Sequence, residues 1–139
     1  GVQTCALPIS KVTEVTGLTR ADLLGKAIPW ADVHSLIAQT DFVIAHNAKF
    51  DYGFITSESQ RHSVSLDIAE PVCTLELSRK LDPKRSESHR LATLCERYGI
   101  PLDNAHDALC DATATARLLS ILIKNHGATT LGDLRRITN

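Results

Sequence analysis

A short apolar run, residues 42–45, is followed at once by polar residues that can begin a helix. Its length and its branched and aromatic side chains are typical of a short buried strand. Asn47 is a natural capping residue for the helix that we expect over residues 48–61. One face of that helix is apolar through Phe50, Phe54 and Ile55. A strand end that leads into a helix is a common place for a rigid site.

The rest of the chain follows the same local rules. Thr19 with Asp22 marks a helix start, Pro29 suits the first turn of a helix, and Ser88 can cap another helix. Gly25, Gly99 and Gly127 mark helix ends. We therefore expect a second short strand at 71–74 and helices at about 21–24, 30–38, 75–81, 89–98, 107–125 and 130–137.

Composition excludes several classes of protein. A chain of 139 residues forms at most one ordinary domain, and its formal net charge of −1 argues against a protein that coats nucleic acid. An enzyme with one local nucleic-acid groove stays possible. The four cysteines form no Cys-x-x-Cys pair, so we expect a reducing cytoplasm rather than a zinc site or disulfide framework. No apolar run approaches the roughly 18 residues that span a bilayer, so we expect no membrane partner.

Three residues stand out as candidates for chemistry. Asp51 falls in the first turn of the helix at 48–61, His106 precedes the long helix at 107–125, and Asp111 lies within its first turn and a half. Two carboxylates and a histidine suggest metal-dependent phosphodiester hydrolysis, since histidine titrates near ~6.5 and can take a proton from water. The alternative is structural: first-turn acids are ordinary helix signals, His106 or Asp107 is only a cap, and Asp111 is a solvated helical acid.

The other polar candidates are weaker. His46 either contacts substrate or is a hydrogen-bonded residue at the strand edge, and the remaining histidines resemble surface or capping residues, namely His34, His62, His89 and His126. Residues 79–90 are locally basic and could contact phosphates. Because acids interrupt this segment, a solvated loop is an alternative at least as well supported.

Taken in order, the motifs resemble the DnaQ-like 3′–5′ exonucleases of the DEDDh type, a family that includes the proofreading epsilon subunit of bacterial DNA polymerase III. The second exonuclease motif corresponds to residues 46–51 and the third to residues 106–112. Between them, residues 73–79 and 89–100 also resemble family sequence. The resemblance covers about residues 9–127, and it implies an α/β fold with a ribonuclease-H-like mixed sheet flanked by helices.

This resemblance implies a site and a reaction. Asp51 and Asp111 would be ligands of two divalent ions, Mg²⁺ or Mn²⁺, and His106 would be the general base. His46, Asn47 and Phe50 are the candidate substrate contacts, with Asn47 and Phe50 seating the terminal nucleotide. The substrate would be a single-stranded or frayed 3′ end of DNA, with RNA as an alternative. Nucleoside 5′-monophosphates would be released, and a DNA polymerase subunit is a candidate partner.

The family's first motif, Asp-x-Glu, is not present. Glu14 follows Val12 rather than an aspartate at the required spacing, and it lies only 37 residues before Asp51. We therefore expect a chain that lacks the N-terminal strands and two of four carboxylates, and that hydrolyses weakly or not at all. A non-catalytic nucleic-acid-binding module is the alternative from another class of protein.

The expected domain organisation has three parts. Residues 1–10 fit no period and resemble translated cloning sequence, so we expect a non-native leader. Residues 11–127 would form the partial exonuclease domain. Residues 128–139 would form a C-terminal helix or the start of a linker.

Overall fold

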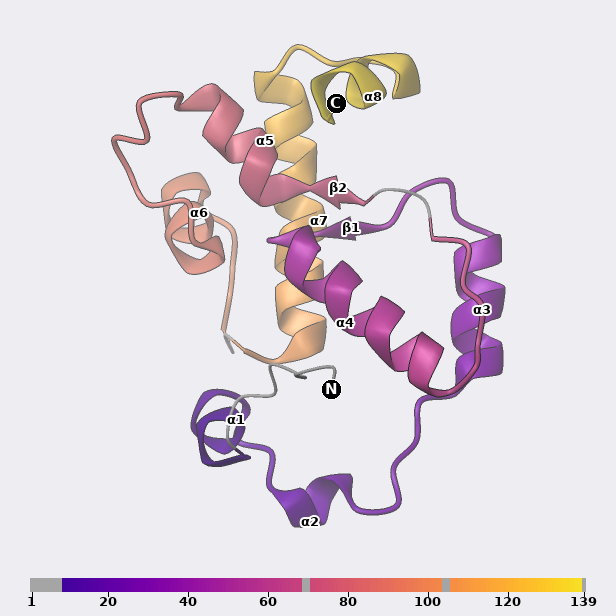
Figure 1. Cartoon of the computed structure of the whole chain (residues 1–139). Coiled ribbons are helices and arrows are strands. Elements are labelled where there is room, and N and C mark those ends of the chain that lie inside the picture. Colours follow the sequence, from indigo (N-terminus) through magenta and orange to yellow (C-terminus); the bar gives the residue numbers. More distant parts are fainter. Residues whose placement is uncertain (1–8, 69–70, 104–105, 139) are drawn as a thin grey trace.

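The computed structural model describes residues 9–68, 71–103 and 106–138 (Figure 1). Within them the chain forms a mixed α/β fold, as expected. Its elements in order are α1 (Ile9–Thr16), α2 (Arg20–Leu23), α3 (Trp30–Ala38), β1 (Ile44–Ala45), α4 (Ala48–Arg61), β2 (Val72–Cys73), α5 (Thr74–Leu81), α6 (Leu91–Tyr98), α7 (Ala108–Asn125) and α8 (Leu131–Thr138).

The two short strands form a parallel pair. Ile44 lies opposite Val72 and Ala45 opposite Cys73, and the Val72 N–H donates to the Val43 carbonyl oxygen at 2.8 Å. Parallel strands need a long crossover connection, which α4 supplies here. The pairing therefore brings the end of β1, where the polar motif begins, beside the start of α5.

The core of the described residues gathers around α7. Ala114, Leu118 and Leu122 are at most 1% exposed and recur every four residues, so they lie on one face of the helix. This face meets buried side chains from β2, α5, α6 and α8, including Val72, Leu77, Leu94, Cys95 and Leu134. Each fully buried leucine contributes roughly 1.5–3 kcal/mol. In Figure 1, α5 and α6 lie beside α7, and α8 lies near the C-terminal end of α7.

Helix α4 has the expected bounds but not the expected burial. Phe50 and Phe54 do recur at helical spacing, yet they are 58% and 56% exposed. Their rings contact each other instead, with centroids 4.9 Å apart. Only Ala48 and Ser59 of this helix are buried. The apolar face of α4 is therefore exposed to solvent in this structure.

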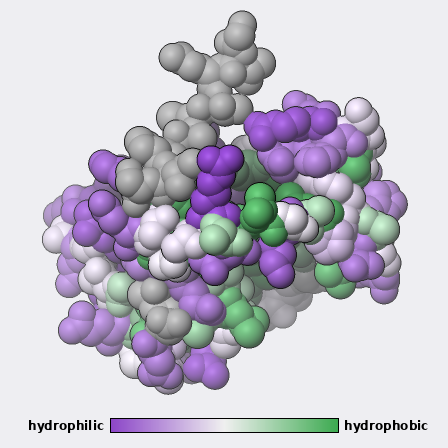
Figure 2. Space-filling model, turned by 90° about the horizontal axis from the view of Figure 1, so that it is seen from below, coloured by the Kyte–Doolittle hydropathy of each residue, from purple (hydrophilic) through white to green (hydrophobic). Residues whose placement is uncertain are grey.

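The helices before β1 bury very little. α2 has the expected capping box, in which Thr19 and Asp22 exchange hydrogen bonds, but neither α2 nor α3 contains a buried residue. The exposed apolar side chains in this region include Val15, Leu18, Leu23, Leu24, Ile28 and Leu36. Figure 2 shows hydrophobic side chains interspersed with hydrophilic ones over the lower face of the molecule.

Several local expectations need correction. Helix α6 begins at Leu91 rather than at His89, and Arg90 is its N-cap residue. Helix α1 was not predicted, because its first two residues were assigned to the non-native leader. The predicted leader falls outside the described residues except for positions 9 and 10, which begin α1. None of the described helices is long and apolar enough to cross a membrane.

Candidate functional site

A cleft of about 880 Å³ brings the second and third motifs together. Its walls come from the end of β1, from α5, from the α5–α6 loop with the start of α6, and from the start of α7. The lining residues are His46, Asn47, Leu75, Arg79, Arg85, Glu87, His89, Arg90, Leu91, Ala92, Leu102, His106 and Asp111. Four of the six residues predicted from the sequence therefore line one cleft.

His106 and Asp111 lie together at the start of α7. The backbone of His106 has a φ of +74°, a left-handed conformation that is uncommon outside glycine. In this conformation its N–H donates to Asp111 Oδ1 at 3.4 Å. The His106 residue is exposed and Asp111 is half-buried. This places an accessible imidazole beside a helical carboxylate.

Asp107 holds the start of α7 in place. Its Oδ1 accepts hydrogen bonds from the N–H groups of Leu109 at 3.1 Å and Cys110 at 3.0 Å. These hydrogen bonds, chiefly those from Cys110, lower the pKa of Asp107 below its ordinary value. Asp107 is thus the N-cap of α7, as one of the alternatives from the sequence held, and it leaves the ring of His106 outside the cap.

His46 is held on both ring nitrogens. Nε2 lies 3.0 Å from the His89 carbonyl oxygen, and Nδ1 lies 3.0 Å from Thr74 Oγ1. A carbonyl oxygen can only accept, so Nε2 carries a proton. In the neutral ring Nδ1 then accepts from the Thr74 hydroxyl, which also lies 3.4 Å from the Ala45 carbonyl oxygen. Burial lowers the pKa of His46 and favours this neutral form. The geometry supports the second alternative for His46, a hydrogen-bonded residue at the strand edge, although its side chain still borders the cleft.

Asn47 lies at the junction of β1 and α4 with a φ of +67°. Asparagine tolerates this left-handed conformation better than most residues. It is the N-cap residue of α4, but its side chain makes no capping hydrogen bond, contrary to the mechanism we expected. The exposed amide therefore remains available to the cleft that it lines.

Asp51 and Phe50 are not among the residues that line this cleft. Partial desolvation raises the pKa of Asp51, although the residue as a whole is exposed on the first turn of α4. Among the described residues no three histidine, cysteine, aspartate or glutamate side chains are close enough to hold a metal ion. The donors present therefore do not by themselves fit the pair of divalent ions that the family resemblance implies.

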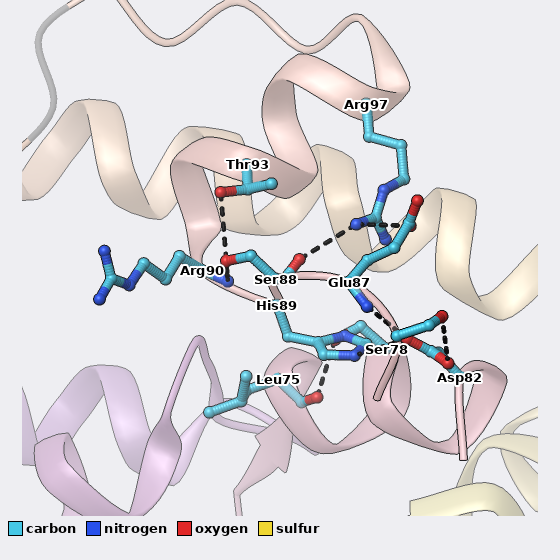
Figure 3. Close-up of polar contacts among 10 residues, drawn as sticks. Leu75, Ser78, Asp82, Glu87, Ser88, His89, Arg90, Thr93 and Arg97 are labelled. Atoms are coloured by element: carbon cyan, nitrogen blue, oxygen red, sulfur yellow. Dashed lines mark hydrogen bonds and ion pairs between the residues drawn. The ribbon is translucent and has the colours of Figure 1, made fainter. Parts of the chain in front are cut away.

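His89 is the residue that the sequence analysis misjudged most. It is buried, with 8% of its surface exposed, rather than a surface or capping residue. Ser78 Oγ lies 3.0 Å from its Nδ1, and Asp82 Oδ2 lies 3.3 Å from its Nε2 without the alignment of a hydrogen bond (Figure 3). Its position just before α6 is typical of a capping residue, so the sequence did not indicate the contact between His89 and Ser78 of α5.

The charged side chains of the cleft differ in their pairing. Arg79 forms an ion pair with Glu76 at 2.6 Å. Glu87 forms one with Arg97 at 2.7 Å, outside the lining. Arg85 and Arg90 are exposed and have no ion pair among the described residues. The cleft thus presents two unpaired guanidinium groups in addition to the carboxylate of Asp111.

Comparison with known proteins gives a consistent result. The exonuclease family RNase T matches residues 4–119 of this chain. Two similar proteins are the DNA polymerases III of PolC type from Streptococcus thermophilus (strain ATCC BAA-491 / LMD-9), 40% identical over 130 residues, and from Lacticaseibacillus paracasei (strain ATCC 334), 38% identical over 136 residues. The alignments cover 88% and 91% of this chain, but the chain spans only 9% of the length of either polymerase.

Among solved structures, the fold is similar to that of exonuclease X in complex with 5′ overhanging duplex DNA. The TM-score is 0.68 at 24% identity, and the match covers 93% of this chain and 73% of that one. This likeness confirms the expected ribonuclease-H-like fold. The family match confirms the DnaQ-like resemblance that the two motifs suggested. The chain therefore belongs to the RNase T family of exonucleases.

Proposed function

We propose that this chain is part of a 3′–5′ exonuclease that hydrolyses DNA from its 3′ end and releases nucleoside 5′-monophosphates. The observation that carries the proposal is the placement of His106 and Asp111 in one cleft, joined by a hydrogen bond at the start of α7. Family membership supports hydrolysis. The similar PolC-type polymerases and the DNA in the exonuclease X complex support DNA rather than RNA as the substrate.

His106 is the general base in this proposal. Its residue is exposed at the cleft, whereas both ring nitrogens of His46 are occupied by Thr74 and His89. Histidine is the side chain that most often accepts a proton in general base catalysis at neutral pH. His106 would take the proton of the attacking water, and Asp111 would hold the backbone N–H of His106 and bind a cation.

Phe50 and Asn47 would seat the terminal nucleotide. The Phe50 ring is largely exposed, and base stacking on an exposed aromatic ring is worth roughly 1–3 kcal/mol. The Asn47 amide has no capping role to satisfy, so it is free to hydrogen-bond a sugar or base. Asp51, on the same turn as Phe50, is proposed as the second carboxylate.

Two divalent ions, Mg²⁺ or Mn²⁺, are the proposed cofactors; Asp51 and Asp111 would be the ligands that this chain contributes, and the ions would supply positive charge for phosphodiester hydrolysis. The described donors do not form a group of three around one point. Two carboxylates poorly offset the charge of two divalent ions, so we expect weak hydrolysis from this chain alone. Association with a DNA polymerase is proposed from the PolC-type relatives, in which the matching segment is part of a polymerase chain.

The test is hydrolysis of a 12-nucleotide single strand labelled at its 5′ end, with Mn²⁺ and excess protein. We expect shortening by single nucleotides from the 3′ end, which His106→Ala and Asp111→Asn abolish. Asp32→Asn, at an exposed acid on α3, is the matched control and should cleave like the unmodified chain. Shortening that persists in both cleft variants would contradict the proposed roles.

A further inference from the structure

The α5–α6 loop is fastened to the molecule by several polar contacts. Asp82 accepts hydrogen bonds from Ser86 Oγ at 3.1 Å and from the Glu87 N–H at 3.2 Å. Desolvation would raise the pKa of Asp82, but these hydrogen bonds hold it below its ordinary value. Buried His89 lies between Asp82 and Ser78, so the loop is anchored on α5 (Figure 3).

The same loop is also fastened to α6. Arg97 donates to the Ser88 carbonyl oxygen at 3.1 Å and pairs with Glu87, and Thr93 donates to Ser88 Oγ at 3.3 Å. In Figure 3 the Arg97 side chain reaches into this network, whereas the Arg90 side chain points away from it. These contacts engage the two acids of the loop, Asp82 and Glu87, although residues 83–88 are exposed to solvent as the solvated-loop alternative holds.

Two arginines of the loop remain unpaired at the cleft. Arg85 has a φ of +50°, and its N–H donates to the Asp82 carbonyl oxygen at 2.9 Å, so an anchored turn sets its direction. Arg90 is the N-cap of α6 and also lines the cleft. A guanidinium group with no carboxylate partner in a nucleic-acid cleft matches the geometry and charge of a phosphate.

We propose that Arg85 and Arg90 bind successive backbone phosphates of the nucleic-acid strand whose 3′ end lies at His106 and Asp111. This inference rests on the proposed function, because it uses the same cleft. In Figure 1 the α5–α6 loop and the start of α7 lie apart, with α6 between them in height. Arg85, Arg90, His106 and Asp111 nevertheless line one cleft, so a single strand lying along this cleft can contact the loop and the start of α7 together. Phosphate contacts position a strand without reading its sequence.

The test measures binding without hydrolysis. Fluorescence anisotropy of a labelled 12-nucleotide thymidine strand is recorded in EDTA at increasing salt, for the unmodified chain and for Arg85→Gln with Arg90→Gln. We expect the double variant to bind several-fold more weakly. Its salt dependence should flatten by about 1.4 in slope, since each single-strand phosphate contact contributes about 0.7. Arg85→Lys with Arg90→Lys keeps both charges and should retain the slope.

The matched control is Arg117→Gln with Lys124→Gln, which also removes two positive charges, from exposed positions on α7 outside the cleft lining. It should bind like the unmodified chain. Equal affinity and slope for the double Gln variant and the unmodified chain would overturn the inference, as would failure of the unmodified chain to bind the strand. Competition by thymidine 5′-monophosphate that depends on both arginines would also overturn it, because the site would then take a free nucleotide.

Failure of this inference can be distinguished from failure of the proposed function. Binding in EDTA needs neither metal nor the general base, so arginine-dependent binding can stand while hydrolysis fails. Conversely, the chain can hydrolyse DNA in a reaction that His106→Ala abolishes, while its strand binding does not depend on Arg85 and Arg90. That result would refute the phosphate contacts and leave the proposed function intact.

Discussion

The two halves of this molecule are built differently. From β2 onward, α5, α6, α7 and α8 bury leucines against one another, and Leu94, Leu118 and Leu122 are 0% exposed. Before β1, α2 and α3 form where the local signals predict them, yet neither contains a buried residue, and exposed apolar side chains there include Leu23, Leu24 and Leu36. Local capping and periodicity thus suffice to form a helix here, but only the second half adds the packing that stabilises a fold.

Most residues of the candidate site come from the well-packed half. His106, Asp111, Arg85 and Arg90 belong to the packed half, and the first half contributes the junction of β1 and α4. His46 joins the two, because its ring is bound by Thr74 of α5 and by the carbonyl of His89. The β1–β2 pair and this one histidine therefore position the second motif against the third.

The largest expected contrast is in core truncation. Leu118→Ala in α7 should lower the free energy of unfolding by about 2–5 kcal/mol, because it leaves a cavity at a fully buried position. Leu36→Ala in α3, at a position 66% exposed, should change it by no more than about 0.5 kcal/mol. Urea denaturation followed by circular dichroism measures both. Similar losses for the two variants would show that α3 packs as tightly as α7.

Removal of a helix cap gives a smaller contrast. Asp107→Ala removes two hydrogen bonds from the start of α7 and should destabilise the protein by about 1 kcal/mol. Thr19→Ala removes the capping box of α2, but α2 buries nothing, so global unfolding should not change measurably. Both are read from the urea midpoint. A shift of the urea midpoint for Thr19→Ala as large as that for Asp107→Ala would contradict the claim that α2 contributes nothing to global stability.

The smallest effect concerns the histidine between the halves. The pKa of His46 is lowered in the folded chain, so the unfolded chain binds the proton more readily. The stability contributed by neutral His46 is complete above its ordinary pKa of ~6.5 and is lost as the pH falls below that value.

His46→Gln should therefore flatten the decline of the urea midpoint between about pH 6.5 and 5. His34→Gln, at an exposed histidine of α3 with no side-chain hydrogen bond or ion pair among the described residues, is the control and should leave the decline unchanged. If the urea midpoint falls with pH in the same way for His46→Gln and the unmodified chain, then His46 titrates alike in the folded and unfolded states.

Much of the fold could be predicted from local signals. The bounds of α3, α4 and α7 follow from Pro29, from the helical periodicity, and from Asp107 with Gly127, and the structure confirms them. Burial could not be predicted in this way. The apolar spacing of α4 is the same whether Phe50 and Phe54 face a core or face water, because spacing reports a face and not its partner.

The site was predictable to a similar degree. The motifs identified Asn47, His106 and Asp111, which the structure places in one cleft. They could not show that Asp51 lies outside its lining or that both nitrogens of His46 are occupied. Nor could they show that His89 is buried, because its partners Ser78 and Asp82 come from another helix and its loop. These are tertiary contacts, which carry no local signal.

The most direct test of the account is hydrogen exchange with and without a 12-nucleotide single strand in EDTA. We expect the strand to slow exchange in residues 82–92 and 106–111 and to leave exchange in α1, α2 and α3 unchanged. Protection confined to α1–α3, or none in the two cleft segments, would contradict the claim that the packed half carries the nucleic-acid site.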